Sequence, residues 1–462
     1  MSNLKRMLLA ALFVPAASGA AEFAFVTTTD YETGSSAVIR FDGSWTTQID
    51  AASIHSDAIS RWHAGLVYVV NRENGDNIQI LDPAAGFSTL RQFSTGNGTN
   101  PQDIAFVDEA KAYITLYDAN HLLIMNTVTG AQLGTIDLSA FADGDGLCEN
   151  SRLRVVDDHL FVTIQRVDRN YWWGPVGDSY VAVVDCETDS LVDADPSTPG
   201  IQAIRLQGAN PYSDILYDEA SERLFVSCVG WWAVNDGGVE IVNPATLASE
   251  GFLLTEAAAG GDIFDFDLSG GGKGYAVVAN SSFFTELVSF DRASGMKIAT
   301  IYAPGAWVIN DIGIAPSGEL FLADQTVLDP GIRIYDTSDD SEITEGPVDT
   351  GLPPYHICFS VPGVTDSEVP AFAGIGAIFP NPFNPSTTIE YSVASAGRVR
   401  LEIYDAAGRK IRTLIDGPHG PGNYRASWDG ANDWGSPSGS GVYFLRFSSE
   451  DAASSGKLVL LR

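Results

Sequence analysis

Basic residues are scarce in this chain of 462 residues. It contains 26 Lys and Arg against 59 Asp and Glu, a formal charge of −33 at pH 7. Proteins that bind the phosphate backbone of nucleic acids need clustered cations, so this composition excludes general nucleic-acid binding. Hydrophobic residues still make up 45% of the chain, which is enough to drive compact folding. The acidity therefore belongs to a folded protein.

Cysteine is also rare. The four residues are widely and irregularly spaced, at Cys148, Cys186, Cys228 and Cys358. This spacing matches no metal-site pattern. A disulfide bridge and four buried thiols are both open alternatives, and either is a structural role.

Long apolar runs are missing, and the one near the start is short. Residues 1–20 contain Lys5 and Arg6, the apolar stretch MLLAALFVPAA, and small residues ending at Ala20. About 20 apolar residues are needed to cross a bilayer, so this pattern predicts a signal peptide cleaved near Ala20 and no transmembrane span. We expect a protein that a bacterium secretes or displays on its outer surface.

The motifs of common catalytic centres are missing too. The six His residues are scattered, and the sequence contains neither GxSxG nor HExxH. No Gly-rich loop precedes a helix. Serine hydrolase, zinc protease and nucleotide-binding functions therefore lack their residues, and we assign no catalytic residue.

The sequence does contain a repeat of about fifty residues, the length of one four-stranded propeller blade. Five copies begin with Asp and a short apolar run, and the copies continue with runs such as LVYVVN and IQILD. The third run ends in Asp or Asn and turn-forming residues, and all runs are short and rich in β-branched residues, which predicts strands. The copies start at Asp57, Asp103, residues 151–153, Asp214, Asp265 and Asp311.

The two ends of the repeat region are incomplete in complementary ways. YHICFS at 355–360 supplies a lone first strand, and residues 23–50 supply the other three. Joined in space they complete a seventh blade and hide the open strand edges. The predicted fold class is all-β, a seven-bladed β-propeller over residues 21–361. The repeats resemble the bacterial YVTN-like and NHL-like propellers, which implies a fold and not an activity.

A second unit follows a Pro-, Gly- and acid-rich linker at 362–374. Residues 371–462 carry nine Lys and Arg and eight Asp and Glu, so the acidity stops at this boundary. From 375 to 462, about six expected strands carry PNPFNPST, YDAAGR, WDG and SGVYF in that order. This segment resembles the FlgD-type immunoglobulin-like domain and the C-terminal sorting domains of type IX secretion substrates. The resemblance implies sorting or attachment at the cell surface, and a purely structural sandwich is the alternative.

Aromatic residues cluster in loops at equivalent places in successive repeats. Loops between the second and third strands share a propeller face with the loops that enter the first strand. Exposed apolar groups usually need a partner, and flat rings stack on the C–H faces of sugars. The candidate ligand-binding residues are Trp172, Trp173, Trp231, Trp232, Phe283, Phe284 and Trp307, with Arg166 and Arg169 beside them. The alternative is that the rings pack against one another and the arginines pair with nearby acids.

Carboxylates form a second candidate set at the mouth of the central channel. It consists of the repeat aspartates with a histidine in the matching place, namely Asp57, Asp103, Asp214, Asp265, Asp311 and His356. Unpaired carboxylates brought together favour a cation, and Ca²⁺ prefers such oxygen ligands. The alternative is that each Asp accepts backbone N–H groups.

The loop FADGDGLCEN adds Asp143, Asp145 and Glu149 to the metal candidates. Its DxDG spacing partly resembles a calcium loop but lacks the full ligand series.

We therefore predict an exported binding protein for a glycan, peptide or other surface ligand, sorted or anchored by its C-terminal domain. The alternative is a metal-dependent, lactonase-like hydrolase that uses the repeat aspartates and His356 at the channel mouth. An open metal site on the carboxylates favours the hydrolase. Carboxylates turned onto backbone amides, with the Trp loops exposed, favour binding.

Overall fold

The computed structural model describes residues 22–108, 110–360, 374–393, 397–419, 422–433, 436–449 and 452–461. The predicted signal peptide and all but the last residue of the predicted linker lie outside this part of the chain. Its α-helical content is one short helix, α1 (Glu256–Ala259), with the 3-10 helices η1 (Pro83–Ala85) and η2 (Ser139–Phe141). Within the described residues, no helix has the length and hydrophobicity that crossing a bilayer requires.

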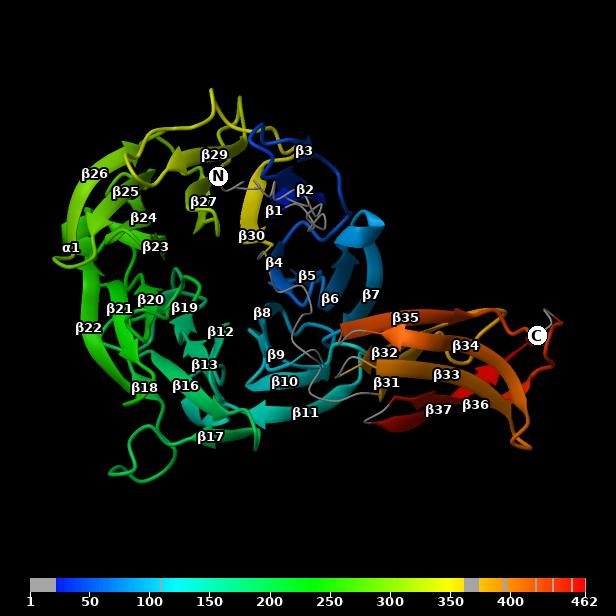
Figure 1. Ribbon diagram of the computed structural model, residues 1–462. Helices are drawn as coiled ribbons and strands as arrows, with labels where there is room; N and C mark the ends of the chain where they lie inside the picture. The colour runs from blue at the N-terminus through cyan, green and yellow to red at the C-terminus, as the bar shows by residue number, and fades with distance from the viewer. Residues whose placement is uncertain are drawn as a thin grey trace, which may run out of the picture.

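Seven sheets of three to five strands lie in the described residues between 23 and 359, and they follow one another around a ring (Figure 1). The first strand of each sheet lies nearest the ring centre, and the ring confirms the predicted fold class. The first four sheets are β30 (Pro354–Phe359), β1 (Phe23–Thr29), β2 (Gly34–Arg40) and β3 (Thr47–Gln48); β4 (Ala58–His63), β5 (Leu66–Asn71), β6 (Asn77–Asp82) and β7 (Ser88–Ser94); β8 (Pro101–Phe106), β9 (Lys111–Leu116), β10 (His121–Asn126) and β11 (Gln132–Asp137); and β12 (Asn150–Val156), β13 (His159–Ile164), β16 (Tyr180–Asp185) and β17 (Ser190–Val192) with β18 (Ile204–Arg205).

The remaining three sheets complete the ring. They are β19 (Leu216–Asp218), β20 (Arg223–Cys228), β21 (Gly238–Asn243) and β22 (Ala248–Thr255); β23 (Asp262–Leu268), β24 (Lys273–Ala279), β25 (Thr285–Asp291) and β26 (Met296–Tyr302); and β27 (Ile309–Ile314), β28 (Glu319–Asp324) and β29 (Gly331–Asp336). A two-stranded ribbon, β14 (Val167–Asp168) with β15 (Gly174–Pro175), projects from the fourth sheet. It carries the Tyr-Trp-Trp loop.

The hydrophobic core is divided among the contacts between neighbouring sheets. Seven buried clusters in the described residues each combine side chains from two adjacent sheets. Ile59 and Val70 of one sheet meet Ile104 and Ile114 of the next in this way. Strands buried on both faces explain why the second and third runs of each repeat are continuously apolar.

The ring closes as the sequence predicts. Strand β1 pairs antiparallel with β30, with Phe25 opposite Cys358 and Val26 opposite Ile357. The first and last strands of the repeat region therefore share one sheet. Cys358 and the other three cysteines are buried free thiols, which decides between the two alternatives for them.

The reversals after the third strands follow one chemical rule. The closing Asp or Asn of each run accepts a hydrogen bond from a backbone N–H two or three residues later, as at Asp82, Asn126, Asp185, Asn243, Asp291 and Asp336. Such turns direct the chain into the outermost strand.

The C-terminal unit is a sandwich of two sheets, as predicted. One sheet contains β31 (Gly374–Phe379), β32 (Thr387–Val393) and β35 (Gly422–Trp428), and the other contains β34 (Lys410–His419), β33 (Gly397–Asp405), β36 (Gly441–Ser448) and β37 (Ala453–Leu460). The seventh strand, β31, exceeds the six expected because GIGAIF shows no alternation of polar and apolar residues.

The sequence motifs of this sandwich have structural roles. Trp428 of WDG is fully buried and its Nε1 donates to the carbonyl of Ala431 at 2.8 Å. The Tyr443 ring of SGVYF packs edge-on against it, with centroids 5.1 Å apart. Asp405 of YDAAGR accepts the N–H groups of Ala407 and Arg409 and so shapes that turn. These motifs build the core and turns of the sandwich.

Replacing Phe25 with Ala tests the contribution of the closing sheet. Phe25 is fully buried between the first two sheets and lies 5.7 Å from the Phe87 ring. The cavity should lower the free energy of unfolding by about 3–5 kcal/mol. Denaturant unfolding of the propeller measures the change. The control Ile298→Ala, on the exposed outer strand β26, should change it by less than about 0.5 kcal/mol, and an equal effect of both variants would contradict the closure argument.

Candidate functional site

A pocket of about 390 Å³ opens where the loops of four neighbouring sheets meet strand β30. We call it the loop-face pocket. It is lined by residues that follow second strands, such as Arg72, Tyr117 and Gln165, and by residues that precede or begin first strands, such as Asn100 and Tyr355. Both kinds of loop therefore face one side of the ring, as the sequence analysis expects.

Aromatic rings form the walls of this pocket. Five of them line it: Tyr117, Trp173, Tyr212, Trp232 and Tyr355. Tyr117 and Trp173 face each other with centroids 6.2 Å apart. Trp232 is fixed from behind, because it stacks on Phe264 at 5.4 Å and its Nε1 donates to the carbonyl of Trp172 at 2.6 Å.

Arg169 supports the Trp173 side of the wall. Its guanidinium carbon lies 4.9 Å from the Tyr117 ring centroid and 5.6 Å from that of Trp173. Its Nε donates to Glu149 at 3.1 Å, and it also pairs with Asp118. Burial raises the pKa of the fully buried Glu149 to about 7, and Arg169 opposes that rise. This ion pair holds the aromatic wall in place.

The other predicted ligand-binding residues lie elsewhere on the loop face. Trp172 is 80% exposed, and Phe283 and Phe284 are also exposed. Trp231 covers the backbone at Gly174, where a Cβ atom would come within 2.1 Å of its ring. Two further residues have partners outside the pocket. Trp307 packs edge-on against Phe264, and Arg166 donates to the carbonyl of Asp178 at 2.9 Å. Of the nine residues, Trp173 and Trp232 line the pocket.

Charges at the pocket rim are paired. Arg72 donates through Nε to Asp57 at 2.9 Å, and its guanidinium also contacts the hydroxyl of Tyr355. Asp57 thus neutralises Arg72. Glu73 follows and adds a further carboxylate to the lining.

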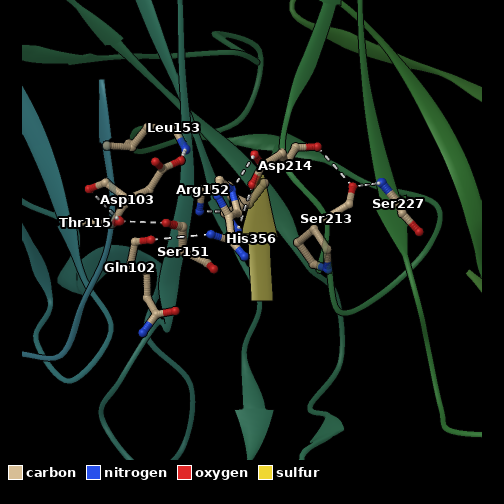
Figure 2. A network of polar contacts seen from close by, with 12 residues as sticks. Gln102, Asp103, Thr115, Ser151, Arg152, Leu153, Ser213, Asp214, Ser227 and His356 are labelled. Atoms are coloured by element: carbon tan, nitrogen blue, oxygen red, sulfur yellow. Dashed lines mark hydrogen bonds and ion pairs between the residues drawn. The ribbon is translucent and has the colours of Figure 1, made fainter. Parts of the chain in front are cut away.

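Arg152 of the pocket lining also belongs to a network in which polar side chains from several first strands meet (Figure 2). Arg61 lies 2.8 Å from both Asp103 and Asp214, and Asp214 also pairs with Arg152 at 3.3 Å. The Nη1 of Arg61 lies 3.0 Å from Nε2 of His356. Burial lowers the pKa of His356 to about 4, which agrees with a neutral ring.

Three of the repeat aspartates accept backbone N–H groups of the next sheet. Asp103 accepts from Leu153 at 3.0 Å, Asp265 from Ile312 at 2.9 Å and Asp311 from Ile357 at 2.6 Å. Each carboxylate thereby joins the innermost strands of two neighbouring sheets. Burial raises the pKa of Asp265 to about 7, and it raises the pKa of Asp311 with a further contribution from the Asp265 charge.

The remaining metal candidates shape their own loop. Asp143 accepts the N–H of Asp145 at 3.1 Å, and Asp145 accepts that of Leu147 at 2.9 Å. In the described part of the chain, no group of three or more His, Cys, Asp or Glu is arranged to hold a metal ion. The calcium assignment therefore stays a prediction.

Several pocket residues were missed by the sequence analysis. Asn100, Ser151, Asn210, Tyr212 and Tyr355 all precede or begin the first strand of a repeat. The sequence feature that could have identified them is their position just before or at the start of a repeat. Among the loops that enter first strands, the sequence candidates included only Trp307.

The comparisons with known proteins give a family for the C-terminal unit. Residues 385–453 match the FlgD Ig-like domain family. This match supports the resemblance carried by YDAAGR and WDG. No curated protein matches the chain at a significant level.

Solved structures resemble the propeller part. A candidate 6-phosphogluconolactonase from Bacteroides fragilis is 15% identical, covers 75% of this chain and 99% of its own, and has a TM-score of 0.53. Another from Bacteroides uniformis is also 15% identical, with 74% and 100% coverage and a TM-score of 0.52. At these identities the likeness shows the propeller-like fold alone.

PorZ, a surface component of the type IX secretion system of Porphyromonas gingivalis, is 13% identical. It covers 92% of this chain and 63% of its own, with a TM-score of 0.43. This overlap is too weak to carry an argument about function.

The raised pKa of Asp265 predicts a pH-dependent stability difference. Its folded pKa lies above its unfolded value, so folding holds a proton that the unfolded chain releases, and wild type loses stability as pH rises from about 4 to about 7. Asp265→Asn keeps an acceptor for Ile312 without the charge. The variant should match wild type near pH 4 and be more stable by about 3–4 kcal/mol at pH 8, because one pKa unit corresponds to about 1.4 kcal/mol.

Chemical unfolding at several pH values measures the Asp265→Asn difference, and Glu345→Gln, on an exposed loop, serves as the control. An Asp265→Asn difference that stays constant with pH would show that the carboxylate is already ionised in the folded protein.

Proposed function

We propose that this chain is an exported binding protein whose propeller holds its ligand in the loop-face pocket. The observation that carries the proposal is the pocket itself, whose lining combines aromatic rings with amide and hydroxyl groups. Its volume falls in the range of small-molecule sites, roughly 300–1,000 Å³. The fixed positions of Trp173 and Trp232 mean that little ordering is needed on binding.

The state of the channel carboxylates supports binding over hydrolysis. Asp103, Asp265 and Asp311 accept backbone N–H groups, and Asp214 is held by Arg61 and Arg152. A metal-dependent hydrolase needs carboxylates free to bind a cation with an open position for water. These four carboxylates already have partners within the protein, and those contacts join the sheets.

The C-terminal sandwich supports the second half of the proposal, sorting or anchoring at the bacterial surface. Its match to the FlgD Ig-like family places a known module type at the end of the chain. Its near-neutral charge suits contact with a partner better than the strongly acidic propeller does. The proposed organisation has three parts: a YVTN-like propeller at residues 21–361, a linker at 362–374 and a sorting domain at 375–462.

A ligand panel tests the binding half. Soluble glycans, short peptides and divalent metal salts are added to the mature protein, and thermal unfolding is followed. We expect one ligand class to raise the Tm of wild type by several degrees, because a ligand that binds only the folded state stabilises it. The rise should disappear in Trp173→Ala and persist in Val327→Ala, an exposed residue outside the pocket. Equal shifts in both variants would place binding elsewhere.

Deleting residues 375–462 tests the sorting half. In a producing bacterium, surface labelling of intact cells should detect the full-length protein and lose most of the truncated one. The purified truncated protein should still unfold cooperatively, because among the described residues the buried clusters of the propeller contain no side chain of the sandwich. Unchanged surface labelling would remove the sorting function.

A further inference from the structure

Two buried polar side chains face the loop-face pocket without a protein partner. Ser151 is 4% exposed and Asn210 is 3% exposed, and both line the pocket. Their backbone groups are bonded, since Ser151 accepts from Thr115 and Asn210 donates to Ser179. Within the described part of the chain, neither the Ser151 hydroxyl nor the Asn210 amide has a hydrogen bond. Neither group is among the enclosed, unbonded polar atoms of the described residues, so both are open to the pocket and can bond an occupant of it.

These two groups both donate and accept hydrogen bonds. A hydroxyl has one donor and two acceptor sites, and an amide has two donors and one acceptor oxygen. An occupant that matches them must do the same at neighbouring atoms. Sugar hydroxyls have this property, whereas carboxylates and phosphates mainly accept, and ammonium groups only donate.

The aromatic rings of the lining select for a flat apolar face on the same occupant. Trp173 and Tyr117 form one ring pair, with centroids 6.2 Å apart, and Tyr212 and Trp232 form another, with centroids 6.3 Å apart. Aromatic rings stack on planar or C–H-rich surfaces. A pyranose ring combines such a face with hydroxyls around its edge.

The charges of the pocket disfavour an anionic occupant. Arg72 is paired with Asp57 and Arg152 with Asp214, so both lining arginines are already neutralised. Glu73 adds a carboxylate to the lining, and the whole chain carries a formal charge of −33. The field of such a protein repels anions from its surface.

We propose that the loop-face pocket binds a neutral saccharide, with a sugar ring stacked on Trp173 and its hydroxyls bonded to Ser151 and Asn210. This inference rests on the proposed binding function and adds the chemical class of the ligand. The inference distinguishes three classes of ligand. Uronic and sialic acids meet no unpaired cation in the described lining of the pocket. The charged groups of cationic peptides donate hydrogen bonds to Ser151 and Asn210 but accept none from them.

An array of three probe sets on the mature protein tests the inference. The sets are neutral di- to tetrasaccharides, sialylated and uronate-containing oligosaccharides, and Lys- and Arg-rich hexapeptides. Hits are titrated by tryptophan fluorescence with wild type, Trp173→Ala, Ser151→Ala and Asn210→Gly. Glycine suits Asn210 because its φ of 55° is left-handed and a larger side chain would add strain. Val327→Ala is the control.

A neutral oligosaccharide should bind, and Trp173→Ala should weaken its binding at least tenfold. Ser151→Ala and Asn210→Gly should each weaken it about fivefold, because a lost hydrogen bond has an effect of that order. Val327→Ala should bind like wild type. The three pocket variants must unfold at temperatures close to that of wild type for these losses to count.

Two other results would overturn the inference in distinguishable ways. Binding of acidic glycans or cationic peptides that is lost in Trp173→Ala would reject the neutral saccharide and leave the binding function in place. A response to none of the three sets, together with no stabilisation in the wider ligand panel, would reject both.

Discussion

Pairing between β1 and β30 is the interaction on which the rest of the structure depends. These strands lie more than 300 residues apart in the sequence, yet Phe25 and Val26 sit directly opposite Cys358 and Ile357. Without this sheet, the cores on both of its sides would lose one wall each. Closing a long loop costs little more entropy than closing a moderate one, so the gain from two complete cores decides the outcome.

Closure also creates an electrostatic problem at the centre of the ring, because each repeat contributes a polar group at its first strand. The chain solves it in two ways. Asp103, Asp265 and Asp311 accept N–H groups from the next sheet, and Arg61 bridges Asp103 and Asp214. Each interaction gives a buried carboxylate a hydrogen-bond or ion-pair partner and joins two sheets. The polar groups that closure brings together therefore also help to hold the ring closed.

The loop-face pocket is built on this rigid centre. Arg169, which the sequence marks as a ligand candidate, instead holds Tyr117 and Trp173 in place through Glu149 and Asp118. The loops can vary in sequence while the sheets below them stay fixed. In such folds the sheets fix where the loop side chains lie, but they do not determine which residue types the loops carry. Ligand recognition therefore depends on the loop residues.

The repeat period and the strand-forming runs closed by Asp or Asn determined the all-β fold and the circular closure from sequence alone. The strand-forming stretches, turns and motifs from residue 375 onward determined the C-terminal sandwich. These properties are local or periodic, and each blade repeats them. Which rings face the pocket was decided only by the tertiary structure. Trp172 and Trp173 are adjacent in sequence, yet one is 80% exposed and the other lines the pocket. Ser151 lies in β12 and Asn210 lies in the loop before β19, and nothing in either local sequence encodes that the ring brings them to one cavity.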